Sequence, residues 1–283
     1  MAISGVVLAV LYSDRGTDGL SFGGRIAVLE LDGVIGDDRQ FIEDLNRFRD
    51  DETIRGYVIA INSPGGVVAP SQSIYREVSR LTGEDSVPVI AAIGGVGASG
   101  GYYVALAADS IFAMPGSITG SIGVIMEFPD ASGLMQKVGV QMQTVQSAEH
   151  KDVGSPFRAL TEGDRALLQE LVFDVYGQFV NAVATERQLS VDSVTTIADG
   201  RILTGQQAMR SGLIDRLGNV PDAIAAVGRM ADLGPDPKVV RPSRESEGIL
   251  GMLLGRQGMG ALNRVVQPLA DLRGPRLMYT TPW

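Results

Sequence analysis

Short apolar runs that alternate with helical patterns set the strongest limit on how this chain folds. Four runs read as buried strands: residues 26–31, 54–62, 87–93 and 111–114. Apolar side chains recur at helical spacing between them, at residues 38–50, 71–81 and 101–108. Strands that alternate with helices indicate a parallel α/β sheet, in which functional sites lie at the carboxyl ends of the strands.

The pattern divides the chain into three parts. Residues 25–233 form the main domain, which continues through helical patterns at 162–187, 204–211 and 220–230. Residues 234–283 become rich in Pro and Arg and then mix apolar residues with glycine. We expect them to form a flexible or oligomer-contacting tail.

Residues 1–24 begin with an uncharged, mostly apolar run and continue as a polar linker. The run is shorter than the roughly 20 residues that span a bilayer, and it lacks the basic flank of a signal peptide. We interpret residues 1–24 as a partial N-terminal membrane anchor with its linker. A first strand or a frayed leader is the alternative.

Composition removes several classes of function. The 33 acidic and 24 basic residues give a net charge of −9, which disfavours a nucleic-acid partner. The absence of cysteine excludes disulfides, thiolate metal sites and a thiol nucleophile. A single histidine, His150, excludes multi-histidine metal sites, and we expect neither a metal nor a cofactor. The lysines are only Lys137, Lys151 and Lys238, so a catalytic lysine has few candidates.

Two glycine-rich turns follow neighbouring predicted strands. Residues 62–66 (NSPGG) close the second strand, and residues 94–101 (GGVGASGG) close the third. Glycines let the backbone approach a substrate carbonyl, and free N–H groups at such turns can form an oxyanion hole.

The residue pattern of the second turn also matches two other motifs. Gly95-x-Gly97-x-x-Gly100 matches a dinucleotide fingerprint, but the next strand ends without the carboxylate that would bind the ribose. Gly97-x-Ser99-x-Gly101 matches the nucleophile elbow of α/β-hydrolases, but their histidine would have to be His150, about halfway along the chain. Glycines that merely allow close helix–sheet packing are a further interpretation.

The motifs NSPGG, GASGGYYVALAAD, GSITGSIGV and HKD together resemble the signal peptide peptidase A family, over residues 25–230. The resemblance implies the Clp protease/crotonase-like α/β fold, with stacked parallel sheets and flanking helices. It implies Ser99 as nucleophile, Lys151 as general base, and Gly65 and Gly100 as oxyanion donors. Ser121 is a candidate for orienting the lysine, in competition with Ser117 and Thr119.

The lysine must satisfy a chemical condition. A lysine accepts a proton only when it is neutral, and the ordinary pKa of a lysine is about 10.4, so its site has to disfavour the ammonium form. Glu149 and Asp152 flank Lys151 and would favour that form, so their carboxylates are expected to face away. His150 is the rival base.

The function expected from this resemblance is a serine endopeptidase with a Ser–Lys dyad. It would cleave remnant signal peptides or other membrane-derived peptides, without a cofactor. The resemblance also implies a ring-like homo-oligomer and attachment to the bacterial cell membrane through the N-terminus. A crotonase-type acyl-CoA enzyme and a non-catalytic peptide-binding membrane scaffold are the rival interpretations.

Overall fold

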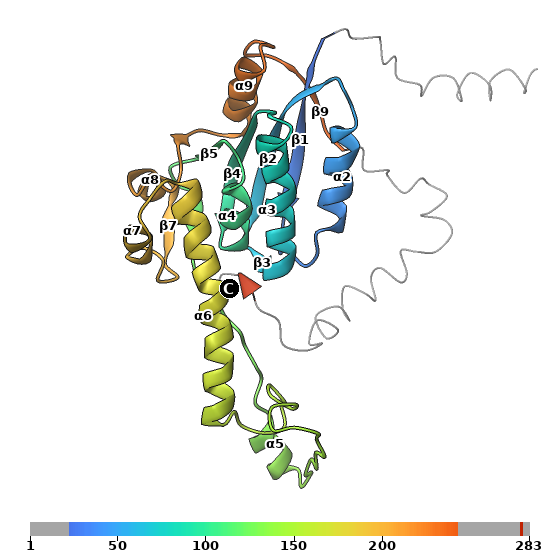
Figure 1. Cartoon of the computed structure of the whole chain (residues 1–283), viewed down its shortest axis with the longest axis vertical. Coiled ribbons are helices and arrows are strands. Elements are labelled where there is room, and N and C mark those ends of the chain that lie inside the picture. The colour runs from blue at the N-terminus through green and yellow to red at the C-terminus, as the bar shows by residue number, and fades with distance from the viewer. Residues whose placement is uncertain (1–22, 243–277, 280–283) are drawn as a thin grey trace, which may run out of the picture.

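A mostly parallel β-sheet forms the centre of the computed structural model, which describes residues 23–242 and 278–279 (Figure 1). Its strands run in the order β7-β6-β4-β2-β1-β9, and β5 and β8 attach beside β4. All pairings in this sheet are parallel except β6 with β7. The bounds are β1 Arg25–Asp32, β2 Ile54–Ser63, β4 Val89–Ala98, β5 Ser110–Ala113, β6 Ile118–Gly120, β7 Ile202–Thr204, β8 Arg216–Leu217 and β9 Lys238–Val240. The expected anchor lies outside the described residues.

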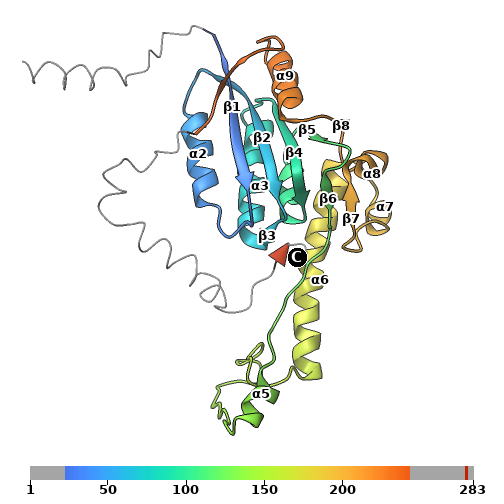
Figure 2. The same cartoon turned by 180° about the vertical axis from the view of Figure 1, so that it is seen from behind.

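Helices cover both faces of the sheet. One face carries α2 (Arg39–Arg49), α3 (Val68–Gly83) and α4 (Gly100–Ala105), and the other carries α9 (Val220–Met230) (Figures 1 and 2). Each of the four predicted strands and of these helices is present. The α/β class with a parallel sheet and flanking helices is therefore confirmed.

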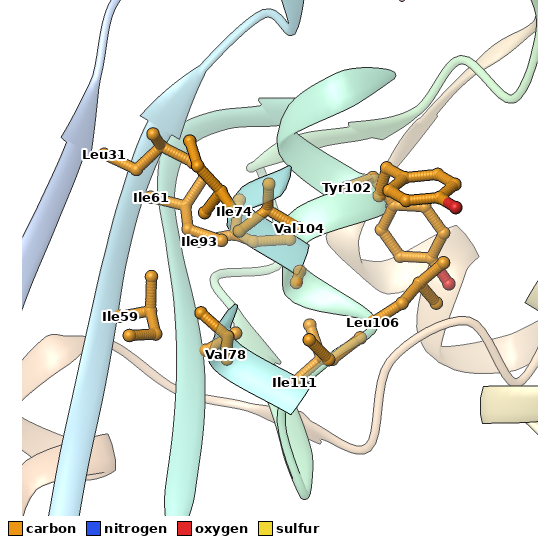
Figure 3. Packing of buried hydrophobic residues seen from close by; sticks show 14 of the residues in the cluster. Leu31, Ile59, Ile61, Ile74, Val78, Ile93, Tyr102, Val104, Leu106 and Ile111 are labelled. Atoms are coloured by element: carbon orange, nitrogen blue, oxygen red, sulfur yellow. The ribbon is translucent and has the colours of Figure 1, made fainter. Parts of the chain in front are cut away.

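Alternation along the central strands supplies both halves of the core. Leu29, Ile59 and Ile93 point to the face covered by α2, α3 and α4, where the larger cluster lies. Figure 3 shows Ile59 and Ile93 within this cluster. Val28, Val58 and Ile90 point to the opposite face and pack with Ala223 and Val227 of α9. Because both faces are covered, these strands read as nearly continuous apolar runs.

Strand β4 changes partner along its length. Its first half pairs with β5, and its last three residues, from Val96 to Ala98, pair with β6. The prediction ended this strand at residue 93, because glycines follow there. Pairing with β6 keeps the glycine-rich segment extended up to Ala98. Strands β6 and β7 therefore belong to the same sheet as β4, where stacked sheets were expected.

A projecting arm leaves the body of the molecule after β6. We define the arm as residues 131–174, which comprise α5 (Ser132–Lys137), a long loop and the first half of α6 (Glu162–Glu186). The second half of α6 packs on the body through Val175, Phe179 and Val183, whereas the first half extends away with α5 beside its end (Figure 1). None of the helices in residues 23–242 is both long and apolar enough to cross a membrane.

Two further helices and two pieces of the expected tail complete the body. Helices α7 (Val191–Thr195) and α8 (Gly205–Arg210) lie next to β7, and β9 pairs with β1. Near the C-terminus, β10 (Met278–Tyr279) pairs antiparallel with β3 (Gly66–Val67). Residues after 233 thus contribute two strands to the fold.

Candidate active site

Ser99 lies at the carboxyl end of β4 and is the N-cap of α4. Its backbone N–H donates to the carbonyl of Gly120 (2.8 Å), and its own carbonyl accepts from Tyr103 (2.8 Å). These bonds hold Ser99 at φ +53° and ψ −116°, a conformation that a non-glycine residue rarely adopts. The Ser99 side chain is fully buried, and Oγ has no hydrogen-bond partner among the described residues.

The two glycine turns meet at this serine. Strands β2 and β4 are parallel neighbours, so NSPGG and GASGG reach the same edge of the sheet. A methyl group on Gly65 would lie 2.6 Å from the backbone N of Gly100 and would overlap the carbonyl O of Tyr279. Gly65 also has φ +100°. As the first residue of α4, Gly100 has an N–H that helical hydrogen bonding leaves free.

Ser63 takes part in this turn, although the sequence analysis assigned it no role. Its Oγ accepts from the N–H of Gly65 at 3.1 Å, and its side chain is fully buried. The interaction fixes the turn after β2 but engages one of the two expected oxyanion donors. Ser63 could have been found from the sequence, because it lies in the motif NSPGG two residues before Gly65, where a serine side chain can accept a hydrogen bond from the turn.

Substituting Gly65 with alanine is expected to lower kcat by about 10² or more, because the new methyl group would displace the oxyanion amides. Hydrolysis of a peptide substrate by the purified variant measures the effect. Gly36→Ala is the matched control, since a methyl group there meets no atom within 4 Å. Equal loss of kcat in both variants would contradict this assignment.

Ser117, Thr119 and Ser121, the candidates for orienting the lysine, differ in their hydrogen bonds. The hydroxyl of Ser117 donates to the carbonyl of Gly94 (2.5 Å), and that of Thr119 donates to the carbonyl of Gly97 (2.8 Å). Both hydroxyls therefore bind β4. Ser121 follows Gly120, whose carbonyl accepts from Ser99, and has φ +51°; its part in orienting the lysine stays a prediction.

Lys151 lies on the arm, far from Ser99 of the same chain. Its neighbour His150 approaches Asp164 in the first turn of α6 (Nδ1 to Oδ1, 3.4 Å). At the other end, Phe179 of α6 packs against Tyr103 of α4, with ring centroids 5.1 Å apart. The 15 residues from Asp164 to Phe179 extend over about 22 Å of helix. One chain therefore brings Ser99, Gly65 and Gly100 together, but not Lys151.

Arg158 organises the loop around Lys151. Its guanidinium binds both carboxylate oxygens of Asp152 (2.7 and 2.9 Å) and also donates to Asp164 (2.5 Å). Asp164 in turn closes a capping box with Thr161 at the start of α6. The carboxylate of Asp152 thus binds Arg158.

The arm is expected to loosen in acid and in the Arg158→Gln variant. The hydrogen bond from Arg158, followed by those from Thr161, lowers the pKa of Asp164 well below its ordinary range. This stabilisation is complete above the ordinary pKa of about 3.9 and is lost as the pH falls through the lowered value. The protection of residues 140–165 against hydrogen exchange, relative to the intrinsic rate at each pH, should fall below pH 4 in the wild type, and already at pH 7 in Arg158→Gln. Unchanged protection in both cases would contradict this role.

In the part of the chain that the structure describes, no three His, Cys, Asp or Glu side chains gather in a group that could hold a metal ion.

Comparison with known proteins gives a family. Residues 82–234 match "Peptidase family S49". "Putative protease slr0021" of Synechocystis sp. is 40% identical over 213 residues, which cover 75% of this chain and 76% of that protein. "Putative signal peptide peptidase SppA" of Enterococcus faecium is 33% identical over 246 residues, covering 82% of this chain and 71% of that protein.

A longer relative shares the same region. "Serine protease SPPA, chloroplastic" of Arabidopsis thaliana is 33% identical over 219 residues, which are 76% of this chain but 32% of that protein. The family match at residues 82–234 includes the second glycine turn, residues 94–101.

Proposed function

Because the chain belongs to peptidase family S49, the family of signal peptide peptidase A, and is therefore a protease, we propose that it cleaves peptides with a Ser–Lys dyad. Ser99 is the nucleophile of the proposed dyad. Lys151 of a second copy of the chain is its general base.

The buried, unpartnered Oγ of Ser99 is the observation that carries the proposal. A buried hydroxyl without a hydrogen bond is unfavourable, so such groups are uncommon in folded proteins. At Ser99 the hydroxyl also lies in a strained turn beside two glycines. A base that enters from outside the chain would supply the missing partner.

The surface of the arm supports a second copy as the source of that base. The arm exposes large apolar side chains at Leu134, Val138, Val140, Met142, Val145, Phe157, Leu171 and Phe173. Exposed apolar groups in such number mark an interaction surface. An arm that packs on a neighbouring copy would bury them and carry Lys151 to that neighbour's Ser99, and repetition of this contact would close a ring.

In the proposed reaction, Ser99 Oγ attacks the carbonyl carbon of the peptide bond and transfers its proton to the neutral amine of Lys151. The N–H groups at Gly65 and Gly100 stabilise the oxyanion, and Gly65 must release Ser63 to do so. The C–N bond then breaks, and the leaving amine takes the proton. Water hydrolyses the acyl-enzyme and restores both residues.

Remnant signal peptides and other membrane-derived peptides are the proposed substrates. The printed name of the Enterococcus faecium relative supports this class. Residues 1–24 would attach the protein to the bacterial cell membrane through their apolar run. No metal or cofactor enters the proposed reaction.

Labelling with a fluorophosphonate probe tests the proposal. The probe should react with Ser99, as identified by mass spectrometry of the labelled peptide, and peptide hydrolysis should stop with labelling. A crotonase-type acyl-CoA enzyme or a non-catalytic scaffold would not be labelled at Ser99. Absence of label on a folded, assembled protein would refute the serine nucleophile.

A further inference from the structure

Ser63 engages the turn after β2 through a buried hydrogen bond. Its Oγ accepts from the backbone N–H of Gly65 at 3.1 Å, and its side chain is fully buried. Pro64 lies between the two residues and has no N–H, so the Gly65 amide is the first donor after Ser63 along the chain. Serine side chains accept in this way from amides two residues ahead in tight turns. The Gly65 amide is therefore already bonded, although the proposed reaction uses it as an oxyanion donor.

The two acceptors of the Gly65 amide exclude each other. A methyl group on Gly65 would lie 2.6 Å from the N of Gly100, so this amide lies beside the other expected oxyanion donor. A hydrogen bond is strong only when the N–H points nearly straight at its acceptor. One N–H cannot point at Ser63 Oγ and at an oxyanion in the same conformation, so the two oxygens compete for it.

The backbone of the turn allows this exchange of acceptors. Gly65 has φ +100°, in a region that glycine enters without strain. Its carbonyl accepts from the N–H of Ile35 (2.9 Å), and the N–H of Val67 donates to the carbonyl of Ile35 (2.8 Å). The N–H and the carbonyl of one residue belong to different peptide planes. Rotation of the Pro64–Gly65 plane can therefore turn the N–H away from Ser63 while both bonds to Ile35 stay.

A second buried serine beside the same glycines plays a different part. Ser71 of α3 is fully buried, and a methyl group on Gly100 would lie 2.6 Å from its Oγ. The Ser71 hydroxyl donates to the carbonyl of Val67 at 2.9 Å. Loss of this hydroxyl would release a carbonyl, whereas loss of the Ser63 hydroxyl would release an amide. The two serines therefore form a matched pair for an experiment.

We propose that Ser63 is a positioning residue that holds the Gly65 amide out of the oxyanion hole until the substrate carbonyl displaces it. The inference rests on the proposed function, because it takes the Gly65 amide as an oxyanion donor. In each turnover the Gly65 N–H leaves Ser63 Oγ and donates to the carbonyl oxygen of the substrate. The buried amide thus keeps an acceptor before and after the exchange, and the cost of an unsatisfied donor is avoided.

The exchange of acceptors fixes the direction in which Ser63→Ala acts. Alanine removes a hydrogen bond that the free enzyme contains and the transition state does not. Because the net contribution of one neutral hydrogen bond is modest, kcat/KM should rise about three- to tenfold. A side chain that only stabilised the turn would have the opposite effect, since its loss would misplace the Gly65 amide and lower kcat/KM.

The rate at which a fluorophosphonate probe labels Ser99 measures the exchange directly, because the phosphoryl oxygen takes the place of the oxyanion. The second-order rate constant should rise about three- to tenfold in Ser63→Ala. Ser63→Cys should give an intermediate rise, since a thiol is a weak acceptor. Ser71→Ala, the matched control, should not exceed the wild-type rate. Circular dichroism checks the fold of each variant, and Ser63→Cys decides the outcome if Ser63→Ala does not fold.

Hydrogen exchange at the Gly65 amide gives a readout that a purely structural role would not produce. Measured by mass spectrometry with residue resolution, this amide should exchange at least about tenfold faster in Ser63→Ala than in the wild type before labelling. After labelling of Ser99 the amide should be equally protected in both proteins, because it then donates to the phosphoryl oxygen. In the wild type it should be protected in both states.

The outcomes distinguish failure of this inference from failure of the proposed function. If Ser99 is labelled but the folded Ser63 variants react no faster than the wild type, the role of Ser63 is wrong while the serine nucleophile stands. Equal exchange of the Gly65 amide in wild type and Ser63→Ala before labelling would also overturn the role of Ser63. If Ser99 is labelled in none of the folded proteins, the proposed function fails, and the role of Ser63 fails with it.

Discussion

Replacement of Ser99 with alanine is expected to abolish peptide hydrolysis and fluorophosphonate labelling, with a loss of at least about 10³-fold in kcat. The variant lacks the nucleophile, but its backbone bonds to Gly120 and Tyr103 do not involve the side chain. Circular dichroism and size-exclusion chromatography should therefore match the wild type. Hydrolysis of a peptide substrate measures the loss.

Ser99→Gly distinguishes the chemistry at this position from its stability. A residue held at φ +53° with ψ −116° costs of order 1–3 kcal/mol, which glycine does not incur. Ser99→Gly should be as inactive as Ser99→Ala but unfold at a higher temperature. Residual activity of either variant above about 1% of the wild-type rate would exclude Ser99 as the nucleophile.

The meeting of the two glycine turns could be predicted from the sequence. Each turn directly follows a buried strand, and parallel neighbouring strands end at the same edge of a sheet. The structure pairs β2 with β4 and brings Gly65 within contact of Gly100. The local sequence pattern was sufficient to predict β2 and β4, because strands that are buried on both faces are nearly continuous apolar runs.

Features that depend on contacts remote in sequence were not predictable. Strands β3 and β10 are two residues long, and only their pairing and the burial of Tyr279 define them. The helical pattern at residues 162–187 predicted α6, but not that the first half of this helix leaves the body. The distance of Lys151 from Ser99 follows from that projection, which no local pattern in the sequence indicates.

Lys151→Ala is expected to lower the rate by about 10²–10⁴-fold, and by more if the nucleophile depends wholly on this base. His150→Ala should have a mild effect, since the His150 ring lies 3.4 Å from Asp164 on the arm, where Arg158 also binds Asp164. Lys137→Ala controls for the loss of one positive charge. If His150→Ala were inactive while Lys151→Ala kept more than half of the rate, the Ser–Lys assignment would be wrong.

The distance along α6 turns this prediction into a test of assembly. If each site combines Ser99 of one copy with Lys151 of another, the inactive variants Ser99→Ala and Lys151→Ala should complement each other. After equal amounts are mixed under conditions that exchange subunits, about a quarter of the sites contain both intact residues, so about a quarter of the wild-type rate should return. A dyad formed within one chain would give no recovery, because every copy then lacks one member. Because about 22 Å of helix separate Asp164, which lies beside His150 on the arm, from Phe179, which packs against α4, we expect recovery.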